Sequence, residues 1–108
     1  MNIQKLIQQI RNKPELYIGC LDIEKLHQFI SGFLFCNIIN NLADDIDYAF
    51  KERFHQWVRE YIENQKNIRF TEQRNYVYYI SQSFEPNRRM EVFFELCEIF
   101  FEMIKNEK

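Results

Sequence analysis

The stretch from Asp22 to Leu42 limits what this chain can fold into more than any other segment. Its apolar residues recur at helical spacing and also fill the flanks of that helix: Ile23, Leu26, Phe29, Ile30, Phe33, Leu34, Phe35, Cys36, Ile38, Ile39 and Leu42. A helix that is apolar nearly all round is usually buried, with neighbours on several sides. About 21 residues would also span a bilayer, but Glu24, Lys25 and several asparagines argue against that. The stretch therefore predicts the buried central helix of a soluble bundle, over about 22–42.

Four further segments carry helical patterns. In residues 2–12 the apolar positions follow the i, i+3, i+4, i+7 spacing of a helix, and Pro14 ends the pattern. Residues 46–62 and 86–105 each trace one apolar helical face. Thr71-Glu72-Gln73 resembles a helix start, whereas residues 76–80 have a strand-like composition. A lone strand would have no partner to pair with, so we predict a short helix over about 71–82. The chain is thus expected to form one all-α domain, residues 1–108, with four or five helices and no sheet.

Local signals define some of the helix ends. Asp22 is a good N-cap for the central helix, and Asp44 and Asp47 stand at capping-box spacing. Gly32, inside the central helix, costs about 1 kcal/mol relative to alanine. We therefore expect another helix to cross close to the backbone at Gly32.

Composition bounds the class of protein. Glycine and proline occur only twice each, which favours few, long helices. A net charge of −2 argues against a dedicated nucleic-acid binder. Three cysteines, Cys20, Cys36 and Cys97, form no CxxC pair, and the first residues lack a signal-peptide pattern. Both observations favour a reducing compartment, so we expect a cytoplasmic protein.

Two acidic groups are the candidate binding residues. The last predicted helix carries four glutamates within about 60° of one another, at 3.6 residues per turn: Glu91, Glu95, Glu98 and Glu102. This acidic strip is either a solvated outer face or a surface for a basic partner such as a nuclease. The second group consists of Asp44, Asp45 and Asp47. Helix capping and the helix dipole explain this second group as well as binding does.

Other constellations are less specific. A basic segment interleaves with aromatic residues: Lys66, Arg69, Arg74, Arg88 and Arg89 with Phe70, Tyr76, Tyr78, Tyr79 and Phe84. Such mixing suits single-stranded nucleic acid, a protein interface or core packing. His27 and His55 belong to no metal or triad pattern, and we expect each at a helix edge. No catalytic constellation stands out, so the sequence predicts neither an enzyme nor a cofactor or metal site.

Two family resemblances follow from short motifs. The opening Arg11–Gly19 resembles that of gyrase B-type ATPases, but the glycine-rich loops that hold ATP in those enzymes have no counterpart here, because only Gly32 follows. A second pattern extends along the chain: Pro14-x-x-Tyr17-Ile18-Gly19, Leu26, Phe29-Ile30-x-Gly32-Phe33, Phe54-x-x-Trp57-Val58 and Phe93-Phe94-Glu95-Leu96. It resembles small all-helical immunity proteins of bacterial polymorphic and contact-dependent growth inhibition toxin systems. Phe33 stands where that pattern often has tyrosine, and Arg74-Asn75-Tyr76 lacks a tryptophan commonly seen there.

The second resemblance implies a function without implying site residues. Immunity proteins of this kind bind one cognate toxin, through its C-terminal toxin domain, and neutralise it by covering its active site or its target contact. We therefore expect a toxin as the partner, with no direct contact to nucleic acid or membrane. The alternative is a helical adaptor or a regulatory subunit of another bacterial complex. The acidic strip and the Asp44, Asp45 and Asp47 group are the expected toxin-binding residues.

Overall fold

The computed structural model describes residues 1–13, 16 and 22–107. This part of the chain contains five α-helices and one short 3-10 turn, and none of the described residues forms a strand. The elements are α1 (Ile3–Asn12), α3 (Ile23–Ile39), α4 (Asp45–Lys66), α5 (Tyr76–Ser83), the 3-10 turn η1 (Pro86–Arg88) and α6 (Arg89–Asn106). The predicted all-α bundle is confirmed, with no sheet in the described part of the chain.

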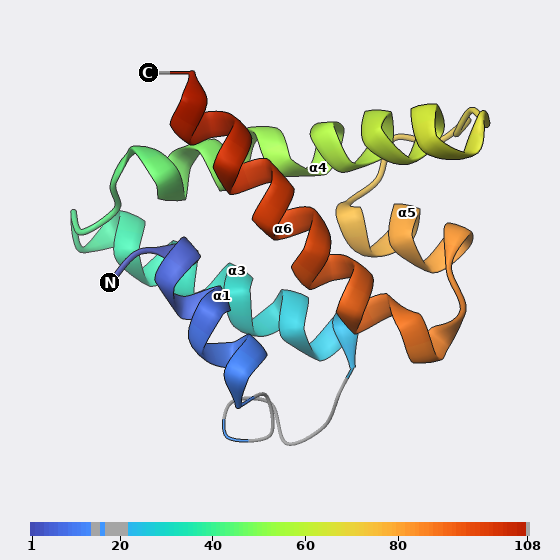
Figure 1. Cartoon of the computed structure of the whole chain (residues 1–108). Coiled ribbons are helices and arrows are strands. Elements are labelled where there is room, and N and C mark those ends of the chain that lie inside the picture. Colours follow the sequence, from blue (N-terminus) through green and yellow to red (C-terminus); the bar gives the residue numbers. More distant parts are fainter. Residues whose placement is uncertain (14–15, 17–21, 108) are drawn as a thin grey trace.

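Helix α6 occupies the centre of the bundle. It crosses the other helices and packs against α1, α3, α4 and α5 (Figure 1). Its buried side chains cover much of its circumference: Val92, Phe93, Phe94, Leu96, Cys97, Phe100, Phe101 and Ile104. The central position expected for residues 22–42 therefore belongs to α6, whose apolar surface is wide enough to meet four neighbours.

Helix α3 is buried on one face only, which corrects the expectation of a helix covered on all sides. Its buried residues share one face: Ile23, Leu26, Ile30, Leu34 and Asn37. On the opposite face Phe35 and Ile39 are 62% and 58% exposed. Outside the backbone of α3 itself and the neighbouring residues in sequence, no described atom lies within 4 Å of the position of a Cβ on Gly32, so the close helix crossing expected there is wrong for this part of the chain. The helix stops at Ile39, before Leu42, because Asn41 takes a left-handed conformation with φ of 58°.

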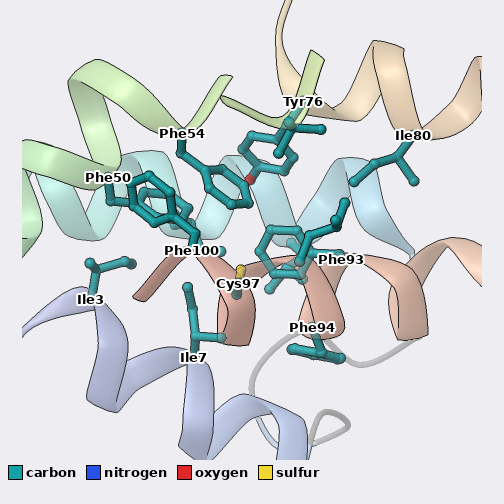
Figure 2. Packing of buried hydrophobic residues seen from close by; sticks show 14 of the residues in the cluster. Ile3, Ile7, Phe50, Phe54, Tyr76, Ile80, Phe93, Phe94, Cys97 and Phe100 are labelled. Carbon is teal, nitrogen blue, oxygen red and sulfur yellow. The ribbon is translucent and has the colours of Figure 1, made fainter. Parts of the chain in front are cut away.

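Aromatic rings from α4, α5 and α6 form a cluster within the core (Figure 2). Phe54 lies at its middle, fully buried. Its ring stacks on Phe50, with centroids 4.4 Å apart, and meets Tyr76 and Phe100 edge-on, each at 5.2 Å. Such ring pairs attract one another beyond the effect of area burial. Helix α1 closes the cluster with the four residues that its spacing predicted: Ile3, Leu6, Ile7 and Ile10.

The helix predicted over residues 71–82 begins later, at Tyr76, and ends at Ser83. Asn75 fixes this start, because its side chain accepts a hydrogen bond from the backbone N–H of Tyr78. Tyr76 and Tyr79, which gave the segment its strand-like composition, are buried on the inner face of α5. Tertiary burial of the tyrosines therefore outweighs their strand propensity.

The predicted caps of two helices are confirmed. The side chain of Asp22 accepts hydrogen bonds from the backbone N–H groups of Glu24 and Lys25 at the start of α3. Asp44 and Asp47 form a reciprocal capping box on α4. None of the described helices is long and apolar enough to cross a membrane.

Candidate functional site

The acidic strip lies on the outward face of α6. All four glutamates are exposed, and the opposite face of the helix packs into the core. Within the described part of the chain, Glu98 alone among them forms an ion pair, with Arg11 Nη1 2.9 Å from its Oε2. Exposed pairs of this kind contribute little to stability. The strip therefore presents four negative charges on one face of α6, of which one is paired with Arg11, while the exposed Arg88 and Lys105 stand at its two ends.

Two hollows lie beside the C-terminal half of the strip. One, of about 280 Å³, lies between α1 and α6 and is lined by Glu98 and Glu102. The other, of about 480 Å³, lies where α1, α4 and α6 meet, and its charged lining residues are Asp45, Glu107, Arg53 and Lys105. Gln4 and Phe101 line both hollows, so the two adjoin. The structure thus places Asp45 in a hollow next to the one that Glu98 and Glu102 line, although the sequence suggested two separate surfaces.

Asp44 is the N-cap residue of α4. It is exposed, and its carboxylate accepts hydrogen bonds from the Asn2 side chain at 3.0 Å and from the Asp47 backbone N–H at 2.9 Å. Burial acts to raise the pKa of Asp44, but these hydrogen bonds outweigh it and lower the pKa below its ordinary value. Capping therefore explains Asp44, while Asp45 beside it is exposed and makes no capping contact.

Asp47 does not belong to a binding surface, because its side chain is fully buried. Its Oδ1 accepts a hydrogen bond from the backbone N–H of Ile3 at 2.7 Å. Its Oδ2 accepts from the backbone N–H of Asp44 at 3.1 Å and from Nδ2 of Asn37 at 3.5 Å. One carboxylate thus accepts hydrogen bonds from backbone N–H groups at the N-termini of both α1 and α4, where the helix dipoles favour a negative charge. The expectation that Asp47 binds a partner is corrected: it joins α1, α3 and α4.

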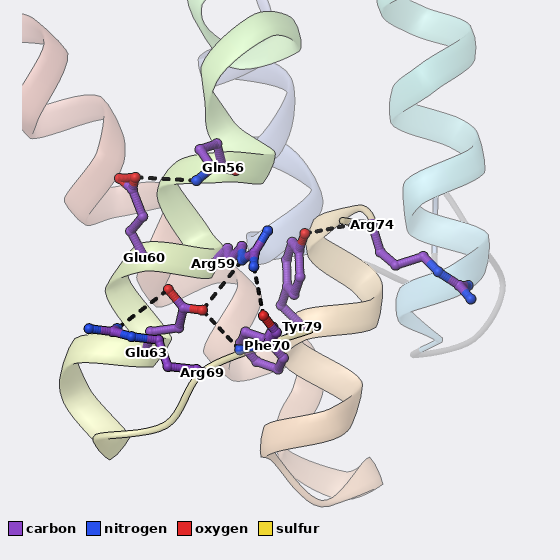
Figure 3. A network of polar contacts seen from close by, with 8 residues as sticks. All are labelled: Gln56, Arg59, Glu60, Glu63, Arg69, Phe70, Arg74 and Tyr79. Carbon is purple, nitrogen blue, oxygen red and sulfur yellow. Dashed lines mark hydrogen bonds and ion pairs between the residues drawn. The ribbon is translucent and has the colours of Figure 1, made fainter. Parts of the chain in front are cut away.

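A polar clamp fixes the loop between α4 and α5 (Figure 3). Oε2 of Glu63 accepts hydrogen bonds from the Phe70 backbone N–H at 2.9 Å and from Arg59 Nε at 3.4 Å. Arg59 in turn donates to the Phe70 carbonyl at 2.7 Å. The Phe70 N–H first, and then Arg59, hold the pKa of Glu63 below its ordinary value against the opposing effect of burial. The clamp therefore depends on a charged Glu63, with Arg69 as a second, outer cation at 3.8 Å.

The basic segment is largely occupied with its own aromatic rings. Lys66 Nζ lies 4.5 Å from the centroid of the Phe84 ring, and the Arg88 guanidinium lies 5.8 Å from the same centroid. The Arg74 guanidinium lies 5.1 Å from the Tyr78 centroid. Cations over ring faces attract the rings, and they cover the surfaces on which nucleic-acid bases would stack. This arrangement favours a structural role for the segment.

Two histidines meet around Tyr76, which nothing in their sequence spacing indicated. Nδ1 of His27, on α3, lies 2.9 Å from the Tyr76 hydroxyl. The backbone N–H of Tyr76 donates to Nδ1 of His55, on α4, at 3.1 Å, and the His55 ring stacks on the Tyr76 ring. His55 therefore has an unprotonated Nδ1 in this conformation. Burial lowers the pKa of both histidines; His27 lowers that of His55 further, and Glu24 opposes the shift at His27.

The histidines line a groove of about 320 Å³ between α3 and α4. Most of its lining is apolar, including Ile30, Leu34 and Phe35. No carboxylate is among its described lining residues, so neither histidine has the orienting acid that a histidine base usually has there. Among the described residues, no group of three or more His, Cys, Asp or Glu side chains is placed to hold a metal ion.

The histidine pair predicts a pH dependence of stability. The ordinary pKa of each histidine is 6.5, and in the folded state both pKa values are lower. Below pH 6.5 the unfolded chain therefore binds more protons than the folded chain, and stability falls as the pH drops. Each histidine contributes a slope of at most about 1.4 kcal/mol per pH unit. Urea unfolding between pH 7.5 and 5.5 measures this loss.

The control for this prediction is the double variant His27→Gln with His55→Gln, in which glutamine oxygens can accept the same hydrogen bonds. Its unfolding free energy should change less than that of the natural chain over the same pH range. Equal slopes in the two proteins would assign the pH dependence to other groups.

Comparison with known proteins finds no relative: no protein-family model, no curated protein and no solved structure matches the chain. The motif positions that resemble immunity proteins include Leu26, Phe54, Val58 and Phe93, all of which are buried. The Pro-x-x-Tyr-Ile-Gly part, residues 14–19, lies outside the described residues except for Leu16. The resemblance thus concerns mainly core positions.

Proposed function

We propose that this chain is an immunity protein that binds and neutralises a bacterial toxin, and that the acidic strip of α6 receives a basic surface of that toxin. The resemblance to immunity proteins supports the functional class. The observation that carries the choice of surface is the row of four exposed glutamates, of which one forms an ion pair. The protein acts by binding alone, covering the toxin's active site or its contact with the target.

Charge on the strip serves association more than affinity. Complementary potentials steer two proteins together and raise the association rate, whereas a few packed, desolvated residues supply most of the binding energy. Arg11 is suited to that second task. Its guanidinium lies 5.8 Å from the Phe94 ring centroid and pairs with Glu98, so it is held in place at the edge of the strip. Arginine is also one of the residues most often found at the energetic centre of interfaces.

The alternative is a helical adaptor or regulatory subunit, and co-expression separates the two functions. The test uses the toxin domain encoded immediately upstream of this chain's gene, expressed in cells with and without the chain. An immunity protein restores growth in the presence of the active toxin, and the purified pair forms a stable complex. Continued growth arrest with both proteins well expressed contradicts the proposal, and the absence of any upstream toxin gene favours the adaptor.

A further inference from the structure

We propose that two copies of this chain associate through the outer face of α3, formed by Gly32, Phe35, Cys36 and Ile39 and continued by Leu42. All five residues are exposed. The four residues within α3 lie across the helix from Ile30 and Leu34, which face the core, and Phe35 and Ile39 also border the groove between α3 and α4. This outer α3 face is separate from the acidic strip, so the proposal is independent of the proposed function.

The exposed apolar area of this face is large for a small monomer. Phe35, Ile39 and Leu42 are 62%, 58% and 70% exposed. Given the size of such side chains, they leave roughly 350 Å² of mostly apolar surface open to water. Contiguous apolar patches of several hundred Å² on soluble proteins commonly mark interaction sites. An interface of standard size buries about 800 Å² on each partner, so these three residues would form the centre of such an interface.

The absence of charge on this face points to a second copy as the partner. The sequence from Leu26 to Ala43 contains no Asp, Glu, Lys or Arg, in a chain in which 28% of residues are charged. Like charges keep identical molecules apart, and α3 presents none from Leu26 onward; the charge that borders this face is Lys51 of α4, which lines the groove beside Phe35 and Ile39. A foreign partner would find no complementary charge on this part of α3. An uncharged apolar face is instead complementary to itself, as a two-fold symmetric contact requires.

Gly32 gives the contact its geometry. Glycine is a poor helix residue, and no described atom packs within 4 Å of its missing Cβ. A second α3 helix, running antiparallel with the two-fold axis near Phe35, would place Ile39 of each copy opposite Gly32 of the other. The two Phe35 rings would then meet at the axis. An open glycine opposite a large aliphatic side chain allows close packing of the two helices, which accounts for the glycine that the monomer leaves unexplained.

Sedimentation equilibrium of the whole chain, at concentrations from about 1 to about 100 µM in one buffer, measures the molecular mass in solution and so tests the proposal. The natural chain should form a dimer. Phe35→Glu, which places two like charges at the axis, should weaken the dimer by about 30-fold or more. Ile99→Glu is the matched control, because Ile99 is an equally apolar residue, 41% exposed, on α6. It should leave the dimer intact. A natural chain that stays monomeric, or a dimer that Phe35→Glu leaves unchanged, overturns the proposal.

Cys36 provides a second test that does not depend on a destabilising substitution. This exposed thiol lies beside the expected axis, while Cys97 is buried. In a Cys20→Ser background, a short bismaleimide should convert most of the protein into a covalent dimer. The control, in the same Cys20→Ser background, carries Cys36→Ser and Gln65→Cys, so that its exposed thiol lies at the far end of α4. It should remain monomeric under the same treatment. Equal cross-linking of the two proteins would contradict a contact through α3.

Discussion

Replacing Asp47 with alanine is expected to lower the free energy of unfolding by about 3 kcal/mol, because the loss of a buried carboxylate leaves several buried donors without partners. The orphaned groups are the backbone N–H groups of Ile3 and Asp44 and the side-chain amide of Asn37. Two of these donors are in or next to the first turns of α1 and α4, so the change also removes a favourable charge at two helix N-termini. Alanine additionally leaves a small cavity.

Urea unfolding at pH 7 measures this effect, and Asp45→Ala is the matched control. Asp45 stands in the same first turn of α4 but is exposed, and its replacement by alanine removes the same charge. Its replacement should change stability by no more than about 0.5 kcal/mol, as is usual for surface substitutions. Equal effects of the two substitutions would show that Asp47 acts through charge alone and not through its buried hydrogen bonds.

The sequence predicted local features of the fold well. Regular spacing identified the four buried residues of α1, and cap residues identified the starts of α3 and α4. These features depend on neighbours a few residues away, which the sequence displays directly. The choice between α3 and α6 as the central helix could not be made in the same way. Both segments are rich in apolar residues, and only the packing of the other helices leaves one face of α3 open.

The candidate site was predictable in part for the same reason. Helical periodicity placed the four glutamates on one face of α6, and all four are exposed. The role of Asp47 was half visible: the capping box was evident, but its burial depends on Ile3 and Asn37, which are 44 and 10 residues away. The meeting of His27 and His55 around Tyr76 depends on three different helices. No spacing rule connects those positions, so sequence reasoning missed the cluster.

Neutralising the acidic strip is expected to slow binding to the toxin by about 10-fold at low salt, because electrostatic steering raises association rates by at least that factor. The variant carries glutamine at positions 91, 95, 98 and 102. Its dissociation rate should change little, since charges at an interface rim act mainly on association. Its fold should survive, because the substitutions remove like-charge neighbours on one helix and a single exposed ion pair.

The control variant carries the same change at four exposed glutamates elsewhere: Glu24, Glu52, Glu72 and Glu85. It has the same net charge as the strip variant, so it separates the effect of the strip from that of overall charge. If the toxin binds at the acidic strip, the association rate of this control should fall much less than that of the strip variant.

The central claim is that the acidic strip receives the toxin, and association kinetics at about 0.05 M and about 0.5 M salt test it most directly. The natural chain should associate much faster at low salt than at high salt. The strip variant should associate slowly at both, with a flattened salt dependence, while the control variant resembles the natural chain. An association rate that the strip variant leaves unchanged at both salt concentrations would contradict the claim and make the strip an ordinary solvated face.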